Sequence, residues 1–391
     1  MARRIPMIIG ERMMTKLAMV AFVTICALGG CAAPQVKIAP VFFPPPPENP
    51  HVQYLTGISD STDVGENKKQ GGFSLLVTGS QADVIRKLGK SYGIYARNGK
   101  IYVAESTGGA VVVIDPVKGT LDSITGAGDP RGTLKSPVNV TVDTEGYLYV
   151  ADPARKDIVV FDPAGKFARS FGSDLGNYAK IVDVAISPEG DLYALDMGTG
   201  VVRVLDRMTG QEKRTVGKFD ALEKSLRLPD GIAVDSAGFI YVTNIGNSKL
   251  MKYDRDGNFL TAFGGMGDHA GNMVRPKGVA VDDAGRIFEV DAGLGLVQIF
   301  NEQGRLLMYF GQSGLPQGSL NMPAGISVTK DNLDLYQKFA APGFKLEEVI
   351  FVINQYGQEY HIPRVSIYGL GHMEGKEEPA ADSKKENSEK K

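Results

Sequence analysis

The stretch Arg275–Asp291 decides the fold of this chain. It reads Arg-Pro-Lys-Gly-Val-Ala-Val-Asp from 275 to 282, Asp-Ala-Gly to 285, and Arg-Ile-Phe-Glu-Val-Asp to 291. The same phrase recurs at Leu228–Asn244, so Gly231 and Gly278 occupy equivalent positions 47 residues apart. Taken along the chain, the equivalent positions are Gly93, Asn139, Asp183, Gly231, Gly278 and Gly325, in steps of 44 to 48 residues. A fixed period of this length indicates an array of small, similar units.

Each unit is predicted to form four short strands. In the fifth unit we expect them at 278–281, 287–290, 297–300 and 306–310, because these runs are rich in Val, Ile, Leu and Phe. Gly, Asp and Asn separate the runs, as is typical of tight turns. A four-stranded antiparallel sheet leaves both faces uncovered, and radial stacking of several such sheets covers them. The sequence therefore predicts an all-β protein with the architecture of a β-propeller.

The sixth unit is irregular. Its first strand fits at 325–328, but residues 333–339 then carry apolar side chains at helical spacing behind Asp331. This pattern predicts a short helical insertion capped by Asp331. Strands are expected again at 349–354 and 364–368, and no fourth strand follows them.

The missing fourth strand is predicted to come from the other end of the chain. Phe73–Gly79 resembles the outer strand expected at Phe259–Gly265, and it leads directly into the first unit. The prediction is therefore a propeller of six blades, whose last blade is closed by this N-terminal strand.

The repeated pattern also resembles a known family. Pro-x-Gly-[Ile/Val]-Ala-Val-Asp, followed by Gly-x-[Ile/Leu]-Tyr-Val-[Ala/Thr]-[Asp/Asn], is similar to the NHL repeat. From about residue 50 to residue 371 the chain resembles bacterial six-bladed NHL-repeat lipoproteins. The resemblance implies an NHL-type propeller, which we expect at 73–371. NHL propellers mostly bind proteins, nucleic acids or glycans, and a minority of related propellers are enzymes, so the fold does not by itself settle the function.

Residues 1–30 have the pattern of a lipoprotein signal peptide. A basic region ending at Lys16 precedes the apolar core Leu17–Leu28. A core of this length is short for a bilayer span and suits a signal peptide. Leu28-Gly29-Gly30-Cys31 resembles a lipobox, after which Cys31 is diacylated and becomes the first residue. The alternative to a lipobox is a secretory peptide cut at Ala32 or Ala33. The start of the chain is a separate open point, with Met13 or Met14 as alternatives to Met1.

The resemblance to lipoproteins also implies a location. Several acyl chains on one cysteine anchor a protein stably to a bilayer. Ala32 and Ala33, rather than an aspartate, follow Cys31, which by family resemblance permits transport to the outer membrane. We therefore expect a protein that is lipid-anchored in the bacterial envelope, at the outer membrane.

Two segments are expected to lie outside the propeller. Residues 31–72 contain four consecutive prolines at 44–47, which favour a semi-rigid polyproline II stalk. An SH3-type ligand is the alternative interpretation of the prolines. Residues 372–391 are mostly charged, and they predict a disordered tail.

The overall charge weighs against one class of partner. The formal net charge is −2 at pH 7, and the isoelectric point is about 6.2. Non-specific binding of nucleic acid depends on clustered Lys and Arg that neutralise phosphates. We therefore expect no nucleic-acid partner, and we expect a monomer.

Cysteine and histidine offer little catalytic chemistry. Cys26 lies in the signal core and Cys31 is the predicted lipidation site, so the mature chain has no disulfide, no Cys-ligated zinc and no other thiol. The histidines occupy positions that differ from blade to blade, which argues against a ring-centred zinc site; they are His51, His269, His361 and His372. The sequence predicts neither a catalytic residue nor a metal ligand among them.

One ring of polar residues is in register. The residue that ends the second strand of each unit carries a side-chain oxygen; these residues are Glu105, Asp152, Asp196, Asn244, Asp291 and Asn354. In one interpretation each caps its own loop by accepting backbone N–H groups. In the other they form an acceptor ring at the channel mouth that holds water, Ca²⁺ or a cationic group. Calcium prefers six to eight oxygen ligands at about 2.3–2.6 Å.

A second set of residues forms the predicted partner-contacting patch. Asn139 and Asp183 replace glycine at the start of their inner strands, so they are expected to project toward the axis. Asp230 and Lys277 directly precede the equivalent glycines, and they complete the patch.

Two functions remain open on the sequence alone. The first is a membrane-anchored, extracytoplasmic binding scaffold that presents a propeller face to an envelope protein or polysaccharide. The second is a metal-dependent propeller enzyme of the lyase or lactonase type. The acidic residues recur from blade to blade, as a rule of the fold would require, and this favours the scaffold.

Overall fold

The repeated phrase forms the inner part of a four-stranded antiparallel sheet. In the fifth blade β19 (Pro276–Val281), β20 (Ile287–Asp291), β21 (Leu296–Phe300) and β22 (Leu306–Phe310) lie in this order from the centre outward. The computed structural model describes residues 39–64, 85–172, 180–218, 221–356 and 362–375, and its strands belong to the unit Pro40–Lys391. The predicted signal peptide, Cys31 and residues 376–391 lie outside the described part.

Four further blades have the same strand order. Blade 1 consists of β3 (Ser91–Arg97), β4 (Lys100–Glu105), β5 (Ala110–Asp115) and β6 (Thr120–Ile124). Blade 2 consists of β7 (Asn139–Val142), β8 (Leu148–Asp152), β9 (Asp157–Phe161) and β10 (Phe167–Phe171). Blade 3 consists of β11 (Ile181–Ile186), β12 (Asp191–Asp196), β13 (Val201–Asp206) and β14 (Glu212–Val216). Blade 4 consists of β15 (Pro229–Val234), β16 (Ile240–Asn244), β17 (Lys249–Tyr253) and β18 (Phe259–Gly264).

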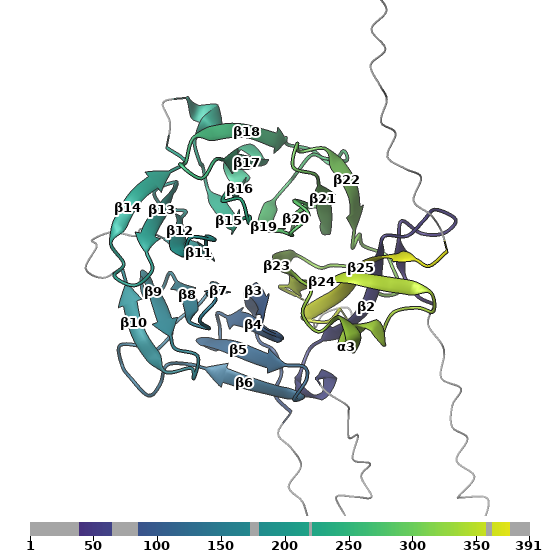
Figure 1. Cartoon of the computed structure of the whole chain (residues 1–391), viewed down its shortest axis with the longest axis horizontal. Helices are drawn as coiled ribbons and strands as arrows, with labels where there is room; N and C mark the ends of the chain where they lie inside the picture. Colours follow the sequence, from purple (N-terminus) through teal and green to yellow (C-terminus); the bar gives the residue numbers. More distant parts are fainter. Residues whose placement is uncertain (1–38, 65–84, 173–179, 219–220, 357–361, 376–391) are drawn as a thin grey trace, which may run out of the picture. The chain divides into compact units, whose positions relative to one another are not determined.

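The sheets form a closed ring around a central axis (Figure 1). The innermost strands of neighbouring blades contact one another around the ring; they are β3, β7, β11, β15, β19 and β23 (Pro323–Thr329). The prediction of an all-β, six-bladed propeller is confirmed.

Blade 6 is closed by N-terminal strands, as predicted, but by a different segment. Its order is β1-β2-β25-β24-β23, where β24 is Phe344–Asn354 and β25 is Val365–Met373. β2 (Val52–Ile58) pairs antiparallel with β25, and β1 (Phe42–Phe43) pairs with β2. The expected closing segment, Phe73–Gly79, lies outside the described residues.

Burial explains why β2 takes this place. Val52, Leu55 and Ile58 are buried, and the ring of Tyr54 packs edge-on against Tyr368 of β25 with centroids 5.5 Å apart. Both closing strands lie inside 31–72, the range predicted to be a stalk, so the propeller begins well before residue 73. At the other end β25 continues to Met373, two residues into the predicted tail.

The predicted helical insertion is present as α3 (Leu333–Gln337). Its N-cap is Asn332, which makes no capping hydrogen bond with its side chain, so the expected cap at Asp331 is wrong. Asp331 instead accepts a hydrogen bond from the Gly99 N–H at 3.0 Å, which ties the insertion to a turn of blade 1. Elsewhere in the described ranges, 3₁₀ turns form η1 (Ser61–Asp63), η2 (Leu222–Lys224) and η3 (Ile245–Asn247).

The hydrophobic core lies between neighbouring blades. One cluster joins Leu195 and Val202 of blade 3 to Ile232 and Val242 of blade 4. Another joins blade 5 to blade 6 and includes Phe43 of β1. Because each sheet buries its faces against its neighbours, no blade can form its core alone.

The glycines of the repeat allow the inner strands to approach closely. A β-carbon at Gly231 would lie 2.5 Å from the carbonyl oxygen of Lys277, and one at Gly278 would lie 2.5 Å from that of Ala324. Such distances are far inside van der Waals contact, so only glycine fits there. Asn139 and Asp183 are the two members of this ring that carry side chains.

Within the described ranges, no helix is long and apolar enough to span a bilayer.

Candidate functional site

One residue from each blade lines the mouth of the central channel. Each directly precedes a member of the glycine ring; these residues are Tyr92, Val138, Val182, Asp230, Lys277 and Ala324. Together with Asn139, Lys180 and neighbouring loop residues, they surround a hollow of about 280 Å³. The mouth is thus shaped by the short loops that enter the inner strands.

The mouth ring contains one ion pair. Lys277 Nζ lies 3.0 Å from Asp230 Oδ1, and both side chains are largely buried. The hydroxyl of Thr243 donates to the carbonyl of Lys277 and accepts from the Gly231 N–H at 2.8 Å. These contacts join blades 4 and 5 and hold Lys277 in place.

Asp183 lies deeper in the channel than the other residues of the predicted patch. It is 5% exposed and lines the channel together with Asn139. Its Oδ1 accepts from the Val184 N–H at 2.7 Å, and its Oδ2 accepts from the Ile232 N–H of blade 4 at 2.8 Å. Burial raises the pKa of Asp183 well above its usual value, against the opposing effect of these two hydrogen bonds.

The predicted patch is therefore brought together only in part. Asn139, Asp230 and Lys277 line the mouth, whereas the carboxyl of Asp183 is used to join two inner strands. Asn139 Oδ1 likewise accepts from its neighbour, the Val140 N–H, at 2.8 Å. Asp183 and Lys277 are both buried.

The six side chains that end the second strands cap loops. Each accepts a backbone N–H from the segment that enters its own blade; the donors are Gly89, Lys135, Lys180, Arg227, Arg275 and Asn321. Asp291 also accepts from the N–H groups of Gly293 and Leu294 at 2.8 and 2.9 Å. The six caps are nearly or fully buried. Their oxygens point at protein backbone and away from an open ring.

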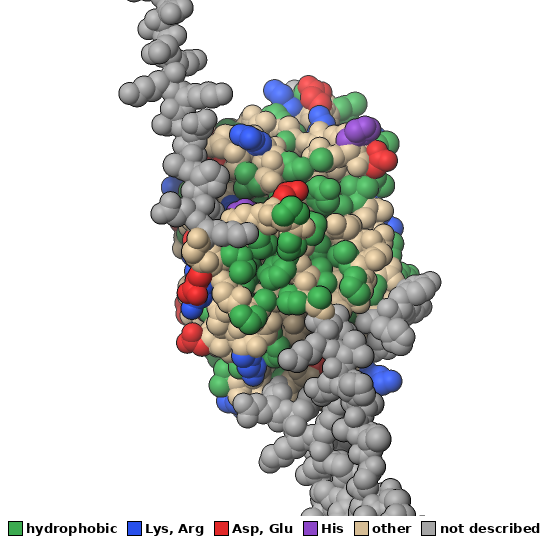
Figure 2. Space-filling view, turned by 90° about the vertical axis from the view of Figure 1, so that its right-hand side faces the viewer, with side chains coloured by type: hydrophobic (Ala, Val, Ile, Leu, Met, Phe, Trp, Pro, Cys, Tyr) green, Lys and Arg blue, Asp and Glu red, His purple; other side chains and the backbone are tan. Residues whose placement is uncertain are grey.

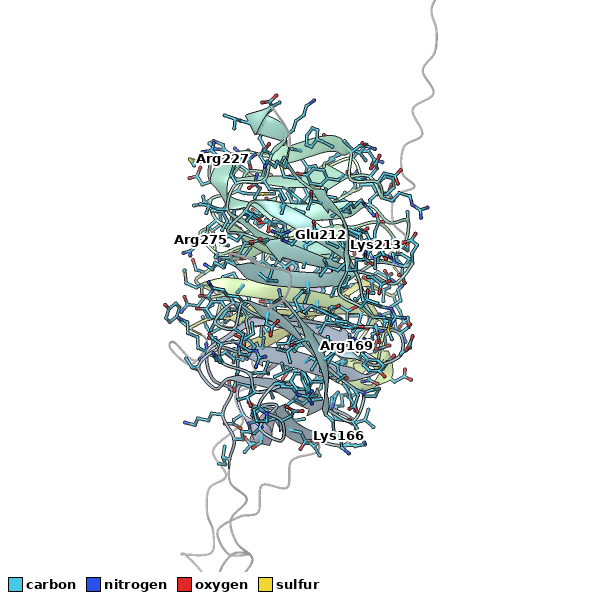
Figure 3. All side chains as sticks on the ribbon, turned by 90° about the vertical axis from the view of Figure 1, so that its left-hand side faces the viewer. Lys166, Arg169, Glu212, Lys213, Arg227 and Arg275 are labelled. Carbon is cyan, nitrogen blue, oxygen red and sulfur yellow. The ribbon has the colours of Figure 1, made fainter. Side chains whose placement is uncertain are left out.

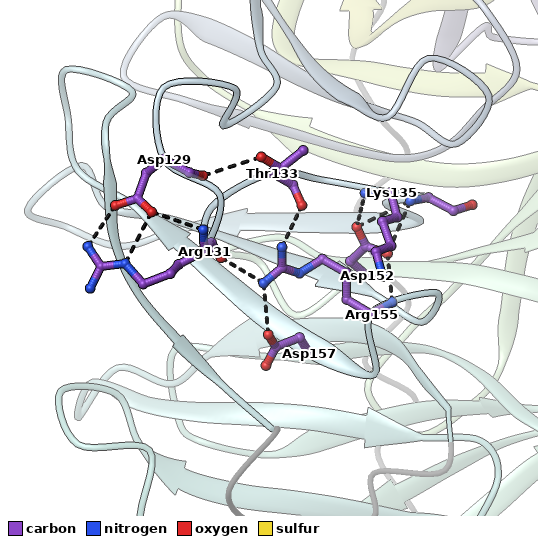
Figure 4. Close-up of polar contacts among 8 residues, drawn as sticks. Asp129, Arg131, Thr133, Lys135, Asp152, Arg155 and Asp157 are labelled. Carbon is purple, nitrogen blue, oxygen red and sulfur yellow. Dashed lines mark hydrogen bonds and ion pairs between the residues drawn. The ribbon is translucent and has the colours of Figure 1, made fainter.

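Asp152 illustrates this arrangement (Figure 4). Its carboxylate accepts from the Lys135 N–H at 2.6 Å and from the Ser136 N–H at 3.1 Å. Nearby, Arg155 donates to two carbonyls of the same entering loop and pairs with Asp157 Oδ2 at 3.1 Å. The loop that leads to the mouth is thus fixed from both sides.

The caps fix the backbone of a set of basic residues in the loops that enter the blades. In four successive blades the residue that donates its N–H to the cap is exposed and cationic; these residues are Lys135, Lys180, Arg227 and Arg275. Among the described carboxylates, none lies within ion-pair distance of these four side chains. We call these residues the basic ring.

Lys180 lines the channel mouth, and Arg227 and Arg275 lie on one face of the propeller. Figure 3 views the molecule edge-on and places Arg227 and Arg275 at one side, with Lys166 and Lys213 toward the other. Sequence reasoning missed this ring, although a signal was present. Each of the four residues precedes its cap by 16 or 17 positions.

The histidines lie apart from the mouth, as far as the structure describes them. His269 is exposed beside Asp268, and His372 contacts Glu347 at 2.8 Å on β24. His361 and Cys31 fall outside the described residues. Across the described ranges, no group of three or more His, Cys, Asp or Glu side chains is arranged to hold a metal ion.

Fold and site together define the class as a six-bladed β-propeller. No protein-family model and no curated protein matches the chain. A protein of unknown function from Bacteroides thetaiotaomicron superposes with a TM-score of 0.55 and 15% identity, over 83% of this chain and 76% of that one.

Two of the similar solved structures are enzymes. A gluconolactonase from Xanthomonas campestris matches with a TM-score of 0.50 and 16% identity, over 83% of this chain and 90% of its own. A virginiamycin B lyase from Staphylococcus aureus reaches a TM-score of 0.49 at 13% identity, over 72% and 95%. At these identities the likeness extends to the fold alone.

Proposed function

We propose that this protein is a membrane-anchored binding scaffold of the bacterial envelope, built on an NHL-type propeller. Lipid attached to Cys31 holds it at the outer membrane, and the channel-mouth face contacts an envelope protein or polysaccharide. One observation carries the choice of face: the loops that the caps fix carry four exposed cationic side chains, of which Lys180 lines the mouth itself, without partners among the described carboxylates.

The chemistry of this face favours an acidic partner. Cationic side chains on loops with a fixed backbone attract anions at long range, and the loops themselves need not be ordered on binding. The hollow inside the ring offers the amide of Asn139 and the Asp230–Lys277 pair. Binding residues concentrate on loops that a rigid scaffold positions, and the entering loops fit that description. An acidic surface or polymer would therefore dock over the mouth with one group in the hollow.

A reversal of charge on the two faces tests the proposal. We expect Lys180→Glu, Arg227→Glu and Arg275→Glu combined to abolish capture of envelope partners by the full chain, without a change in its thermal melting. Lys166→Glu, on the other face, is the matched control and should capture normally (Figure 3). Capture by the parent should also weaken as salt is raised from 50 to 500 mM, roughly from a Debye length of 14 Å to one of 4 Å. If only Lys166→Glu loses capture, the partner binds the opposite face and the proposal is wrong.

A metal-dependent enzyme of the lyase or lactonase type is the second candidate. It draws on Asn139 and Asp183, which line the channel together, and on Asp230, which lies close enough to add to the raised pKa of Asp183. The residues fit a divalent ion poorly, because the Asp183 oxygens accept from two N–H groups and Asp230 pairs with Lys277. Metal analysis of the purified full chain separates the candidates. A stoichiometric Ca²⁺ or other divalent ion, lost in Asp183→Ala, would favour the enzyme.

A further inference from the structure

A large groove lies on the outer side of the ring, away from the channel mouth. It has a volume of about 790 Å³ and separates β22 of blade 5 from the loop that follows β1 in blade 6. Pro44 and Pro45 line one wall, and Leu307 and Tyr309 line the other. Figure 2 shows hydrophobic side chains gathered over the middle of this side of the molecule. The volume lies within the roughly 300–1,000 Å³ typical of small-molecule sites.

Two amide side chains line this groove with unsatisfied oxygens. Asn49 Oδ1 and Gln312 Oε1 are buried from water and have no hydrogen-bond partner within the part of the chain that the structure describes. They come from opposite walls, since Asn49 belongs to the proline-rich loop and Gln312 follows β22. A buried acceptor without a donor is destabilising, because it has lost its hydrogen bonds to water. A small rotation of either amide toward the groove would let a ligand donor remove that cost.

The lining selects against charged anions. It contains the carboxylate of Glu48 and the imidazole of His51 and no Lys or Arg. Carboxamides both donate and accept, so a pair of them suits a ligand with hydroxyl groups, which do the same. The Tyr309 ring, whose residue is 47% exposed, offers a flat apolar face for C–H groups.

The walls also disfavour a peptide strand. The pairing of β22 with β21 shifts register between Leu306 and Met308, and such a bulge twists an edge away from further pairing. The facing wall is proline, which has no N–H to donate to a strand. A ligand of this groove is therefore bound by side chains and not by strand pairing with the backbone.

We propose that the groove is a binding site for a neutral oligosaccharide. One sugar ring stacks its C–H face on Tyr309, and its hydroxyls donate to the amide oxygens of Asn49 and Gln312. The site is separate from the basic ring, so its failure would leave the function proposed for the channel mouth unchanged.

Blade 4 supplies matched controls for the test. Leu260 and Ala262 of β18 lie 47 residues before Leu307 and Tyr309, and Leu260 is exposed to a similar extent as Leu307, at 47% against 51%. Tyr309→Ala therefore installs the residue that blade 4 already has at the equivalent position, and the fold should tolerate it. Leu260→Ala removes an exposed apolar side chain of the same kind far from the groove.

Saturation-transfer NMR with the full chain tests the site, using maltotriose and chitotriose as neutral probes. Trigalacturonate serves as the anionic probe, and the peptide Ala-Val-Ser-Val-Ala as an extended-strand probe. We expect a neutral trisaccharide to bind, about tenfold more weakly with Tyr309→Ala, and several-fold more weakly with Gln312→Ala. Leu260→Ala should bind as the parent does.

Three results would overturn the proposal. These are binding of neither neutral trisaccharide, equal binding by Tyr309→Ala and Gln312→Ala, and tighter binding of the peptide or of trigalacturonate than of either neutral probe.

Discussion

At the scale of single residues, the caps stabilise the blades by accepting backbone N–H groups at the same position of each repeat. Asp291 accepts four backbone N–H groups, two from the entering loop and two from the loop that follows β20. It is fully buried, and so are Asn244 and Asn354 at the equivalent positions of blades 4 and 6. Because both Asp and Asn occupy this buried position, the position requires a side-chain oxygen but not a negative charge.

This arrangement makes a prediction for Asp291. Asp291→Ala should lower the free energy of unfolding by about 2–4 kcal/mol, because it leaves several buried N–H groups without acceptors. Asp291→Asn keeps one oxygen and installs the residue found in two other blades, so it should cost about 1 kcal/mol or less. Thermal melting of both variants measures the difference. Equal melting temperatures for the two would show that the oxygen at this position is dispensable.

Glu289 was not predicted to have a role of its own. It lies in the middle of β20 and is fully buried, whereas Val103, Val150 and Val242 occupy the equivalent positions of three other blades. One carboxyl oxygen contacts Gln298 Nε2 at 3.2 Å, and the other has no hydrogen-bond partner among the described residues. Burial, with the nearby charge of Asp291, raises the pKa of Glu289 well above its usual value.

The raised pKa of Glu289 predicts a pH dependence of stability. Above about pH 4.3 the unfolded chain loses this proton while the folded chain keeps it. The folded state then binds more protons, so its stability falls as the pH rises toward the folded-state pKa. Glu289→Gln should therefore be more stable than the parent at pH 7 and equal to it near pH 4. Denaturant melts across this range test it, with Glu302→Gln, at an exposed site, as the control. A difference that does not change with pH would contradict the assignment.

At the scale of elements, β2 determines whether the ring closes. Val52, Leu55 and Ile58 are buried in its pairing with β25, and burial of one large apolar side chain contributes about 1.5–3 kcal/mol. Deletion of Val52–Ile58 should therefore unfold or aggregate the protein, since whole domains are stable by only about 5–15 kcal/mol.

Deletion of Phe73–Gly79 is the matched control for β2. The described residues on either side of that stretch are already joined, because the Ser61 N–H donates to the Arg86 carbonyl at 2.9 Å and the Leu88 N–H donates to that of Ser59 at 2.8 Å. Shortening the chain between two fixed ends changes its closure entropy little. We expect this variant to melt as the parent does. If it unfolds while the β2 deletion does not, the closure described here is wrong.

The same comparison shows where reasoning from the sequence fails. The inner two strands of each blade repeat closely, because burial on both faces and the close approach at Gly231 and Gly278 allow few residues. Outer strands such as β14 (Glu212–Val216) are half exposed and vary freely. A search for the missing outer strand therefore has little pattern to follow. Its identity depends on pairing with β25, a contact between distant parts of the sequence.

For the site, the register of the six polar residues offered loop capping as one of two interpretations, and it did not indicate which N–H groups they accept. Each cap oxygen binds an N–H 16 or 17 residues upstream in blades 1 to 5, a distance that no local turn rule covers. In blade 6 the separation from Asn321 to Asn354 is 33 residues, because the insertion with α3 lies between them. The basic ring could not be predicted from the sequence, because its members are defined by which residues donate to the caps.

At the scale of the whole molecule, the proposed anchor and the propeller occupy separate parts of the sequence. The first strand of the described part begins at Phe42, eleven residues after Cys31, and the described strands of the ring lie within Pro40–Lys391. Removal of a lipid at Cys31 should therefore change where the protein resides and leave its fold intact.

Cys31→Ala tests the anchor with its own control. We expect this variant to move from the membrane to the soluble fraction while it melts like the parent, because acyl chains supply the membrane affinity at about 0.8 kcal/mol per buried methylene. Cys26→Ala removes the other cysteine of the chain, within the predicted signal core, and should remain on membranes after a high-salt wash. Fractionation of both variants, followed by immunoblotting, provides the measurement. If Cys31→Ala stays with the membranes after the wash, the protein is held there by something other than lipid at this residue. In that case the basic ring would be the first surface to examine for membrane binding.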